Sequence, residues 1–203
     1  MVEIKDKYKT IAQQSEGLYK EKGSKFLSFA FPITSEKQIK EIQQELRKKY
    51  YDARHHVFAW KLGIQDNNYR SSDDGEPSNS SGPPVLGQIR SYELSDILIV
   101  VIRYFGGTKL GIPGLIHAYK TAAAEAIENN KIINKIITHT YKISFAYEDM
   151  NLVMRKLKEQ NIEQQNQEFD LKCSLEINIR LSDCEKTENI FKKIPNINIE
   201  QIS

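Results

Sequence analysis

The segment from Asp96 to Tyr104, DILIVVIRY, constrains the fold more than any other stretch of the chain. Its apolar residues do not alternate with polar ones, as they would in a strand with one face in water. A continuous apolar run of this kind is typical of a strand that is covered on both faces, or nearly so. The segment FGGTKLGIPGLIHAYKTAAAEAIENN follows, and it predicts a glycine loop that opens into an alanine-rich helix with Pro113 near its first turn.

The residues before this segment predict further strands and two helices. Residues 10–21 and 24–33 read as strands, and in HHVFAWKLGI the alternation places His55 and His56 on opposite faces of a third strand. A short helix is predicted to begin at Pro84. A longer helix between the second and third strands carries apolar residues at helical spacing, namely Ile39, Ile42, Leu46 and Tyr50.

The last third of the chain predicts a small domain of its own. Alternating, helical and alternating patterns follow one another in the order βαββαβ, and residues 171–181 keep strict period two, as in a central strand with one face in the core. This order is the ferredoxin-like split βαβ arrangement. We therefore expect an α+β protein with a first domain over residues 1–134, a linker around Asn134 and a second domain over residues 138–203.

Composition excludes several classes of protein. The chain has 203 residues, of which 39% are hydrophobic and 28% charged, an ordinary soluble composition. No apolar run approaches the roughly 18 residues of a membrane span, so a cytosolic protein is expected. Cys173 and Cys184 have neither CxxC spacing nor a histidine at ligand spacing, so the sequence predicts no zinc or redox chemistry. The net charge is +4 before residue 137 and −2 after it, which permits a basic face on the first part.

The loop GGTKLG has the parts of an anion site between a buried strand and a helix amino terminus. Gly106, Gly107 and Gly111 would allow close backbone approach with outward N–H groups, and Lys109 and Arg103 would add positive charge. The loop matches neither a P-loop nor a dinucleotide fingerprint. The alternative is that the glycines simply form a tight turn.

The stretch SSDDGEPSNSSGPP contains a second candidate site. Asp73, Asp74 and Glu76 could act as acid and base or hold a magnesium ion, whereas the alternative is a solvated turn shaped by Gly75 and Pro77, with the serines solvating the loop. A structural role predicts that the carboxylates accept hydrogen bonds from backbone N–H groups or pair with an arginine, either Arg54 or Arg103.

Arg54 comes directly before the strand that begins with His55 and His56, and it is also charged. Arg54 and the adjacent His55 and His56 could supply a base or a phosphate contact, although a histidine at a strand start is more often only hydrogen-bonded at the sheet rim. No serine or cysteine lies in a recognisable nucleophile motif. We therefore expect no catalytic residue, no metal and no cofactor.

Three motifs in fixed order resemble one family. The segments ARHHVFAW, SSDDGEPSNSSGPPVL and VVIRYFGGTKLGIPGLIHAYKTA are similar to the IMPACT/YigZ family, over most of residues 17–130. The resemblance implies a first domain like domain two of ribosomal protein S-five and a second domain like the fifth domain of elongation factor G. Eukaryotic relatives act in translation control, by competing for the activator of a starvation-responsive initiation kinase.

The leading hypothesis is a cytosolic, translation-associated accessory protein that binds RNA or a ribosome-associated partner without catalysis, with a possible anion at the glycine loop. The alternatives are a metal-assisted hydrolase or transferase that uses DDGE and RHH, and a protein-interaction module. The oligomeric state is not predicted. The candidate residues for anion or nucleic-acid binding are Arg54, His55, His56, Arg103, Tyr104, Gly106, Gly107, Lys109 and Gly111, and those of the acidic loop are Asp73, Asp74, Gly75, Glu76 and Pro77.

Overall fold

The structure is a computed structural model, which describes residues 6–170 and 172–202. The chain divides into two compact units. The first unit is Tyr8–Lys135, and the second combines the described residues of Met1–Lys7 and Ile136–Ser203. Asp6 and Lys7 belong to the second unit although the predicted bounds placed them in the first, because the Asp6 carbonyl accepts a hydrogen bond from the N–H of Ile137 at 2.8 Å.

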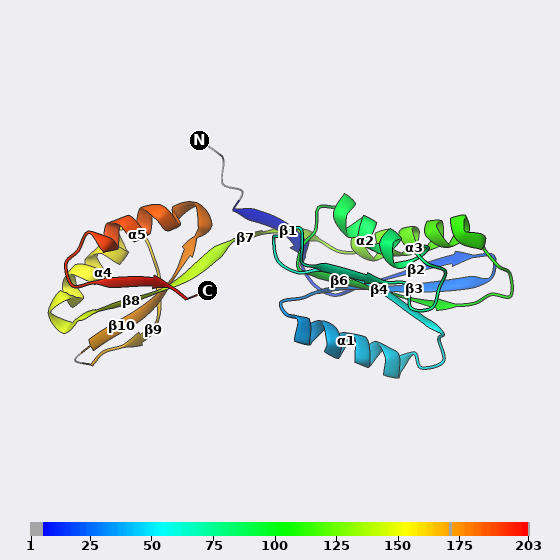
Figure 1. The fold of residues 1–203 in the computed structure, drawn as a ribbon, viewed down its shortest axis with the longest axis horizontal. Helices are drawn as coiled ribbons and strands as arrows, with labels where there is room; N and C mark the ends of the chain where they lie inside the picture. Colours follow the sequence, from blue (N-terminus) through cyan, green and yellow to red (C-terminus); the bar gives the residue numbers. More distant parts are fainter. Residues whose placement is uncertain (1–5, 171, 203) are drawn as a thin grey trace. The chain divides into compact units, whose positions relative to one another are not determined.

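The first unit is built on a five-stranded sheet with helices on both faces. The strand order is β2-β3-β6-β4-β5, and every neighbouring pair is antiparallel. Figure 1 shows α1 on one face of this sheet and α2 and α3 on the other. The elements are β2 (Ser15–Glu21), β3 (Ser24–Pro32), α1 (Glu36–Lys49), β4 (His55–Lys61), β5 (Tyr69–Ser72), α2 (Gly82–Ser91), β6 (Ile97–Tyr104) and α3 (Gly111–Glu128).

The central strand β6 is buried on both faces, which confirms the interpretation of its apolar run. Leu98, Val100 and Ile102 pack in one cluster with residues of α1, on the face that this helix covers. Their neighbours Ile97, Ile99 and Val101 pack in the other cluster with residues of α2 and α3. Because both faces need apolar side chains, the strand cannot alternate.

Side chains at the end of α3 and at its C-cap bond the outer edge of β2. The N–H of Leu18 donates to Glu125 Oε2 at 3.1 Å, and Asn129 Nδ2 donates to the carbonyl of Glu16 at 2.8 Å. Two backbone groups that an additional strand would use are therefore already bonded.

The segment predicted as a linker is an extended strand. β7 (Ile132–Ile136) pairs with β1 (Lys7–Ile11) in a two-stranded sheet. The pairing is supported by the N–H of Ala12, which donates to the carbonyl of Lys131 at 2.9 Å. This strand is short and alternates between exposed and half-buried residues, so the sequence predicted only a linker around Asn134.

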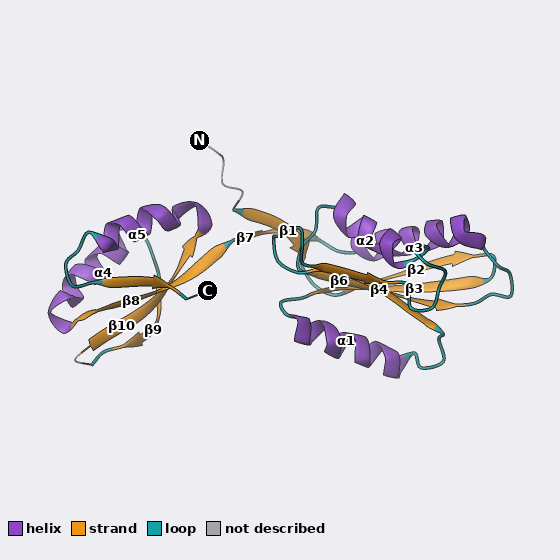
Figure 2. Ribbon diagram, in the orientation of Figure 1, coloured by secondary structure: helices purple, strands orange, loops and turns teal. Residues whose placement is uncertain are grey.

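The second unit has the order βαββαβ, with a four-stranded antiparallel sheet in the order β11-β8-β10-β9. Figures 1 and 2 show α4 and α5 on the same face of this sheet. Tyr141, Ile143 and Phe145 of β8 lie in the core, and the residues between them are polar. Leu171, which begins the predicted central strand, lies outside the described residues. The elements are β8 (Thr138–Ala146), α4 (Met150–Glu159), β9 (Gln164–Glu168), β10 (Lys172–Arg180), α5 (Cys184–Lys192) and β11 (Asn198–Gln201).

The two cysteines are free thiols in the core of the second unit. Among the described residues, no helix has the length and apolar character needed to cross a membrane.

Candidate functional site

The three sequence motifs meet at one end of the five-stranded sheet. In the sheet register, His55 at the start of β4 lies opposite Arg103 near the end of β6, and Phe26 of β3 lies opposite Arg103 on its other side. The acidic loop, residues 73–81, follows β5 and reaches the same end, because its Asp74 contacts the first residues of β4. The glycine loop, residues 105–110, leaves β6 there and leads into α3.

Asp73 holds the acidic loop in its own conformation. Its Oδ1 accepts hydrogen bonds from the N–H of Ser81 at 2.9 Å, the hydroxyl of Ser81 at 2.7 Å and the N–H of Gly82 at 2.8 Å. Its Oδ2 accepts from the N–H of Asn79 at 2.8 Å. Burial raises the pKa of Asp73, but the bonds from Ser81, Gly82 and Asn79 outweigh burial and keep the pKa below its ordinary value.

Asp74 connects the loop to α1 and β4. Its Oδ1 accepts a hydrogen bond from Arg47 Nη2 at 2.7 Å, and its Oδ2 accepts from the N–H of His56 at 2.6 Å. The backbone carbonyl of Asp74 lies 2.8 Å from His55 Nδ1. Three elements of the fold are therefore joined through one residue.

Glu76 enters the core and forms a buried ion pair. Its Oε1 lies 2.7 Å from Arg103 Nη1 and accepts a hydrogen bond from the hydroxyl of Tyr119 on α3 at 2.8 Å. The side chains of Glu76 and Arg103 are only 4% and 8% exposed. Burial and the Glu76 carboxylate raise the pKa of the Tyr119 hydroxyl well above its usual range, so it stays a proton donor to Glu76.

The backbone of the loop explains two further candidates. Gly75 has φ of +86°, a conformation in which other residues are strained, and a side chain there would lie 3.5 Å from the His55 ring. The carbonyl of Pro77 accepts hydrogen bonds from the N–H of Ser80 at 3.1 Å and from its hydroxyl at 2.6 Å. These two residues shape the loop.

The acidic loop is therefore only partly solvated: its carboxylates are bonded within the protein, whereas Gly75, Pro77, Ser78 and Asn79 are exposed. Ser80 and Ser81 are fully buried, and Glu76 is 9% exposed. The predicted pairing with Arg103 is present, whereas Asp74 pairs with Arg47 and not with Arg54. Within the described ranges, no three His, Cys, Asp or Glu side chains are grouped so that they could hold a metal ion.

Arg47 and Tyr119 bind the acidic loop, and neither was predicted from the sequence. Arg47 lies in the last turn of α1, where a basic side chain is favoured by the helix dipole alone. Tyr119 lies on the apolar face of α3 and is indistinguishable by pattern from a core residue. Their separation from the loop along the chain leaves no local signal for either contact.

The two histidines of RHH have different environments. His55 is half-buried and contacts the acidic loop. His56 is 5% exposed on the opposite face. Burial and the nearby Arg47 guanidinium lower the pKa of His56, against the opposing effect of Asp74 and of the Leu46 and Tyr50 carbonyls.

The glycine loop uses its glycines in two ways. A side chain at Gly106 would come within 1.8 Å of the backbone of Gly23, and the N–H of Gly106 donates to the hydroxyl of Ser24 at 3.1 Å. The close approach at Gly106 is therefore made by the β2–β3 turn. Gly107 and Gly111 have φ of +88° and +70° and stand clear of other parts of the fold. Both residues are exposed.

Tyr104 is engaged internally. Its hydroxyl donates to Asp52 Oδ1 at 2.7 Å, and this bond together with burial and the Asp52 charge raises the pKa of Tyr104 to about 12. The carboxylate of Asp52 is thus bonded within the protein, as are those of the acidic loop.

Several basic side chains at the same end of the sheet are not bonded within the described part of the protein. The side chains of five exposed residues make no hydrogen bond or ion pair with any described residue: Lys22, Lys25, Lys48, Arg54 and Lys109. Two aromatic side chains are exposed nearby, Tyr51 at 84% and Phe105 at 60%. The surface at this end, which we call the basic rim, is defined by these seven residues.

Comparison with known proteins places this chain in a family. The model of the Impact N-terminal domain matches residues 22–127. The chain belongs to the IMPACT family. The IMPACT family member YvyE of Bacillus subtilis is 30% identical over 152 residues, which are 75% of this chain and 70% of YvyE. The IMPACT family member YigZ of Escherichia coli is 31% identical over 131 residues, which are 64% of each chain.

A solved structure extends the similarity of fold to the whole chain. A crystal structure of a hypothetical protein has a TM-score of 0.74 and 22% identity, and the match covers 98% of this chain and 99% of that one. Every candidate residue lies inside the region matched by the Impact N-terminal domain.

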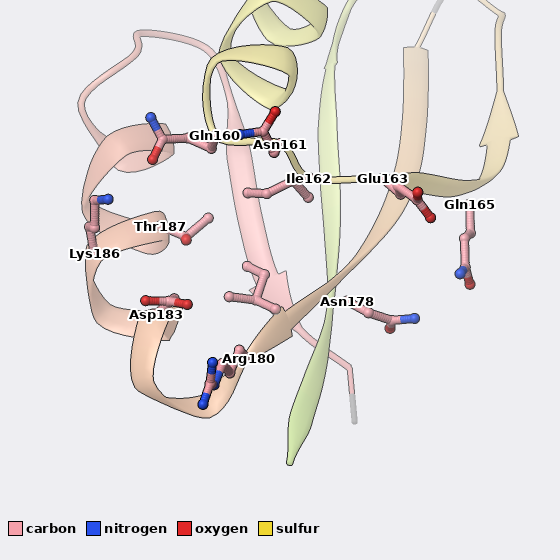
Figure 3. A pocket seen from close by; sticks show the side chains of 11 residues that line it. Gln160, Asn161, Ile162, Glu163, Gln165, Asn178, Arg180, Asp183, Lys186 and Thr187 are labelled. Carbon is pink, nitrogen blue, oxygen red and sulfur yellow. The ribbon is translucent and has the colours of Figure 1, made fainter. Parts of the chain in front are cut away.

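A separate hollow lies in the second unit, outside the Impact N-terminal domain. Its volume is about 470 Å³, and it lies between α5 and the end of α4 (Figure 3). Lys186 and Asp183 of the α5 region and Glu163 at the other wall give it mixed charge. None of the residues predicted from the sequence lines it.

Proposed function

We propose that this IMPACT family member is a cytosolic, translation-associated regulatory protein that binds RNA through the basic rim and performs no catalysis. The observation that carries the proposal is the division of charge at this end of the sheet. The carboxylates of Asp73, Asp74 and Glu76 are bonded inside the protein, whereas Lys22, Lys25 and Lys109 are exposed without a partner among the described residues. Free cations beside bonded carboxylates favour a polyanionic ligand.

The start of α3 supports the proposal. Leu110 precedes this helix without a side-chain cap, and Pro113 in its first turn has no N–H to satisfy. The N–H groups that remain, beside Gly107 and Lys109, form a site with which an RNA phosphate is compatible.

The link to translation comes from the family and from the two folds that the resemblance implies. We infer that the first unit is similar to domain two of ribosomal protein S-five and the second to the fifth domain of elongation factor G. The βαββαβ order of the second unit supports the second inference. Fold similarity alone does not define a partner, so the experiments address RNA directly.

The test is RNA binding by the purified protein, followed by fluorescence anisotropy over a range of salt concentrations. Replacing Lys109 by Gln should weaken binding and reduce the slope of log affinity against log salt by about 1 if one phosphate contact is lost. The matched control is Lys186→Gln in the second unit, which should leave the slope unchanged. Absence of binding at low salt, or equal slopes for both variants, would count against RNA at the basic rim.

A pull-down from lysate with and without ribonuclease separates RNA from the alternative of a ribosome-associated protein partner. Ribosomal components that remain after ribonuclease treatment would favour the protein partner. The enzyme alternative is tested by isothermal titration with magnesium, manganese and zinc. Micromolar binding that disappears in Asp74→Asn would make the acidic loop a metal site.

We also infer that the two units fold separately. Limited proteolysis should release two folded fragments after cleavage between residues 131 and 135, although the pairing of β7 with β1 requires local opening first. Earlier cleavage within the acidic loop, with unfolding of the second unit, would contradict this division.

A further inference from the structure

Phe105 is an aromatic residue that the internal packing of the fold does not explain. It follows β6 directly and is 60% exposed, so most of its ring is open to solvent. It is the first residue of the glycine loop, which also contains Lys109. Single exposed apolar side chains are common on protein surfaces, so the neighbours of this ring decide whether it is a binding surface.

The ring is supported from the protein side. The guanidinium carbon of Arg103 lies 5.6 Å from the centroid of the Phe105 ring and 5.5 Å from that of the buried Phe26. Both separations are within the range of a cation–π contact, about 6 Å. Arg103 itself is fixed by its buried ion pair with Glu76. The acidic loop therefore holds the cation against which the exposed ring rests.

Three lysines lie on the segments of chain that adjoin Phe105. Lys22 lies in the β2–β3 turn, whose Gly23 adjoins Gly106, and Lys25 lies opposite Tyr104 in the sheet register, on the side of the sheet that α1 covers. Both lysines and Lys109 are exposed and have no side-chain partner among the described residues. An aromatic ring next to several free cations is the combination by which proteins bind single-stranded nucleic acid, because bases stack on the ring while phosphates meet the cations.

We propose that Phe105 is a stacking surface for an unpaired RNA base, with the flanking phosphates bound by Lys22 and Lys109. The proposal rests on the RNA-binding function proposed above and names the class of RNA. A base inside a duplex is stacked on both sides and offers no free face to a single ring. The site therefore selects unpaired segments such as loops, bulges and ends.

The probe is an unstructured RNA of about 12 nucleotides that carries one 2-aminopurine, a size within the range of known single-strand sites. Binding is followed by anisotropy, and stacking is followed by quenching of the 2-aminopurine. Phe105→Leu should weaken binding about tenfold and remove the quenching, because loss of one base–aromatic stack has an effect of that order. Phe105→Tyr keeps the ring and should retain both signals.

Two controls separate stacking from charge and from misfolding. Phe169→Leu changes a phenylalanine of the second unit that is 53% exposed, and it should bind as the unchanged protein does. Phe105→Leu should keep the salt dependence of the unchanged protein, whereas Lys109→Gln should reduce it. Circular dichroism melting of Phe105→Leu should match that of the unchanged protein.

The outcomes distinguish this proposal from the function on which it rests. If Phe105→Leu binds the single strand as tightly as the unchanged protein while Lys109→Gln binds it less tightly, RNA binding stands and the stacking role is overturned. Equal affinity for a duplex of the same sequence also overturns it. If the unchanged protein binds neither RNA at low salt, the proposed function fails and this proposal fails with it.

Discussion

The acidic loop and the glycine loop lie at the same end of one sheet, but the polar groups of the first are bonded inside the protein and those of the second are exposed. In the acidic loop, Asp73 binds backbone N–H groups of its own loop, and Glu76 forms a buried pair with Arg103. In the glycine loop, Gly107 and Lys109 are exposed. The carboxylates of the acidic loop therefore stabilise the fold, whereas the glycine loop is exposed to solvent. A polar sequence shows that a group needs a partner, and only the fold shows whether that partner is inside the protein.

The largest expected effect follows from breaking the buried pair. Glu76→Ala leaves Arg103 buried without its carboxylate and removes the acceptor of Tyr119, so we expect the free energy of unfolding to fall by about 3–5 kcal/mol. Denaturation with urea measures this loss. The matched control, Glu45→Gln on the exposed face of α1, should change it by less than about 0.5 kcal/mol. A small effect of Glu76→Ala on the free energy of unfolding would mean that the acidic loop contributes little to stability.

A smaller loss is expected at Asp73. Asp73→Ala removes the acceptor for Asn79, Ser81 and Gly82 at the start of α2, and loss of such a cap costs about 2 kcal/mol at the upper end of its range. Asp73→Asn keeps one acceptor oxygen and should lose less. If both variants unfold at the same urea concentration as the unchanged protein, these hydrogen bonds contribute no net stability.

The pH dependence of stability tests the other face of the sheet. The pKa of His56 is below its ordinary value of 6.5, so the unfolded chain binds the proton more tightly. Its contribution to stability is therefore present above pH 6.5 and is lost as the pH falls through the lower folded-state pKa. Unfolding measured between pH 7 and the acid range should show this decrease, and His56→Gln should reduce its slope. An unchanged slope would show that other groups cause the decrease.

The smallest effect on stability is expected in the glycine loop. Lys109→Glu changes an exposed side chain without a partner among the described residues, so the free energy of unfolding should change by less than about 0.5 kcal/mol. The same variant should lose RNA affinity. A large loss of stability would show that Lys109 has a structural role and would remove the contrast between the two loops.

The predictability of each part from sequence depends on whether its signal is local. The burial of β6 on both faces and the βαββαβ order of the second unit could be predicted, because the spacing of apolar residues within an element shows which of its faces are buried. The pairing of β1 with β7 could not be predicted, since both strands are too short for a clear pattern. The turn chemistry of Gly75 and Pro77 and the pairing with Arg103 were predicted, but the burial of Glu76 and its contact with Tyr119 were not. Tyr119 is 43 residues away and is brought to Glu76 only by the packing of α3 on the sheet.

The covered edge of β2 has a consequence for behaviour at high concentration. An antiparallel sheet ordinarily ends in unpaired backbone groups, which can recruit a strand from a second molecule and begin a fibre. Here Glu125 and Asn129 already bind the N–H of Leu18 and the carbonyl of Glu16. To polymerise through this edge, a second chain would first have to displace two side chains that a rigid helix holds in place. The end of the helix that begins at the glycine loop thus occupies two of the backbone groups through which a second chain could pair with β2.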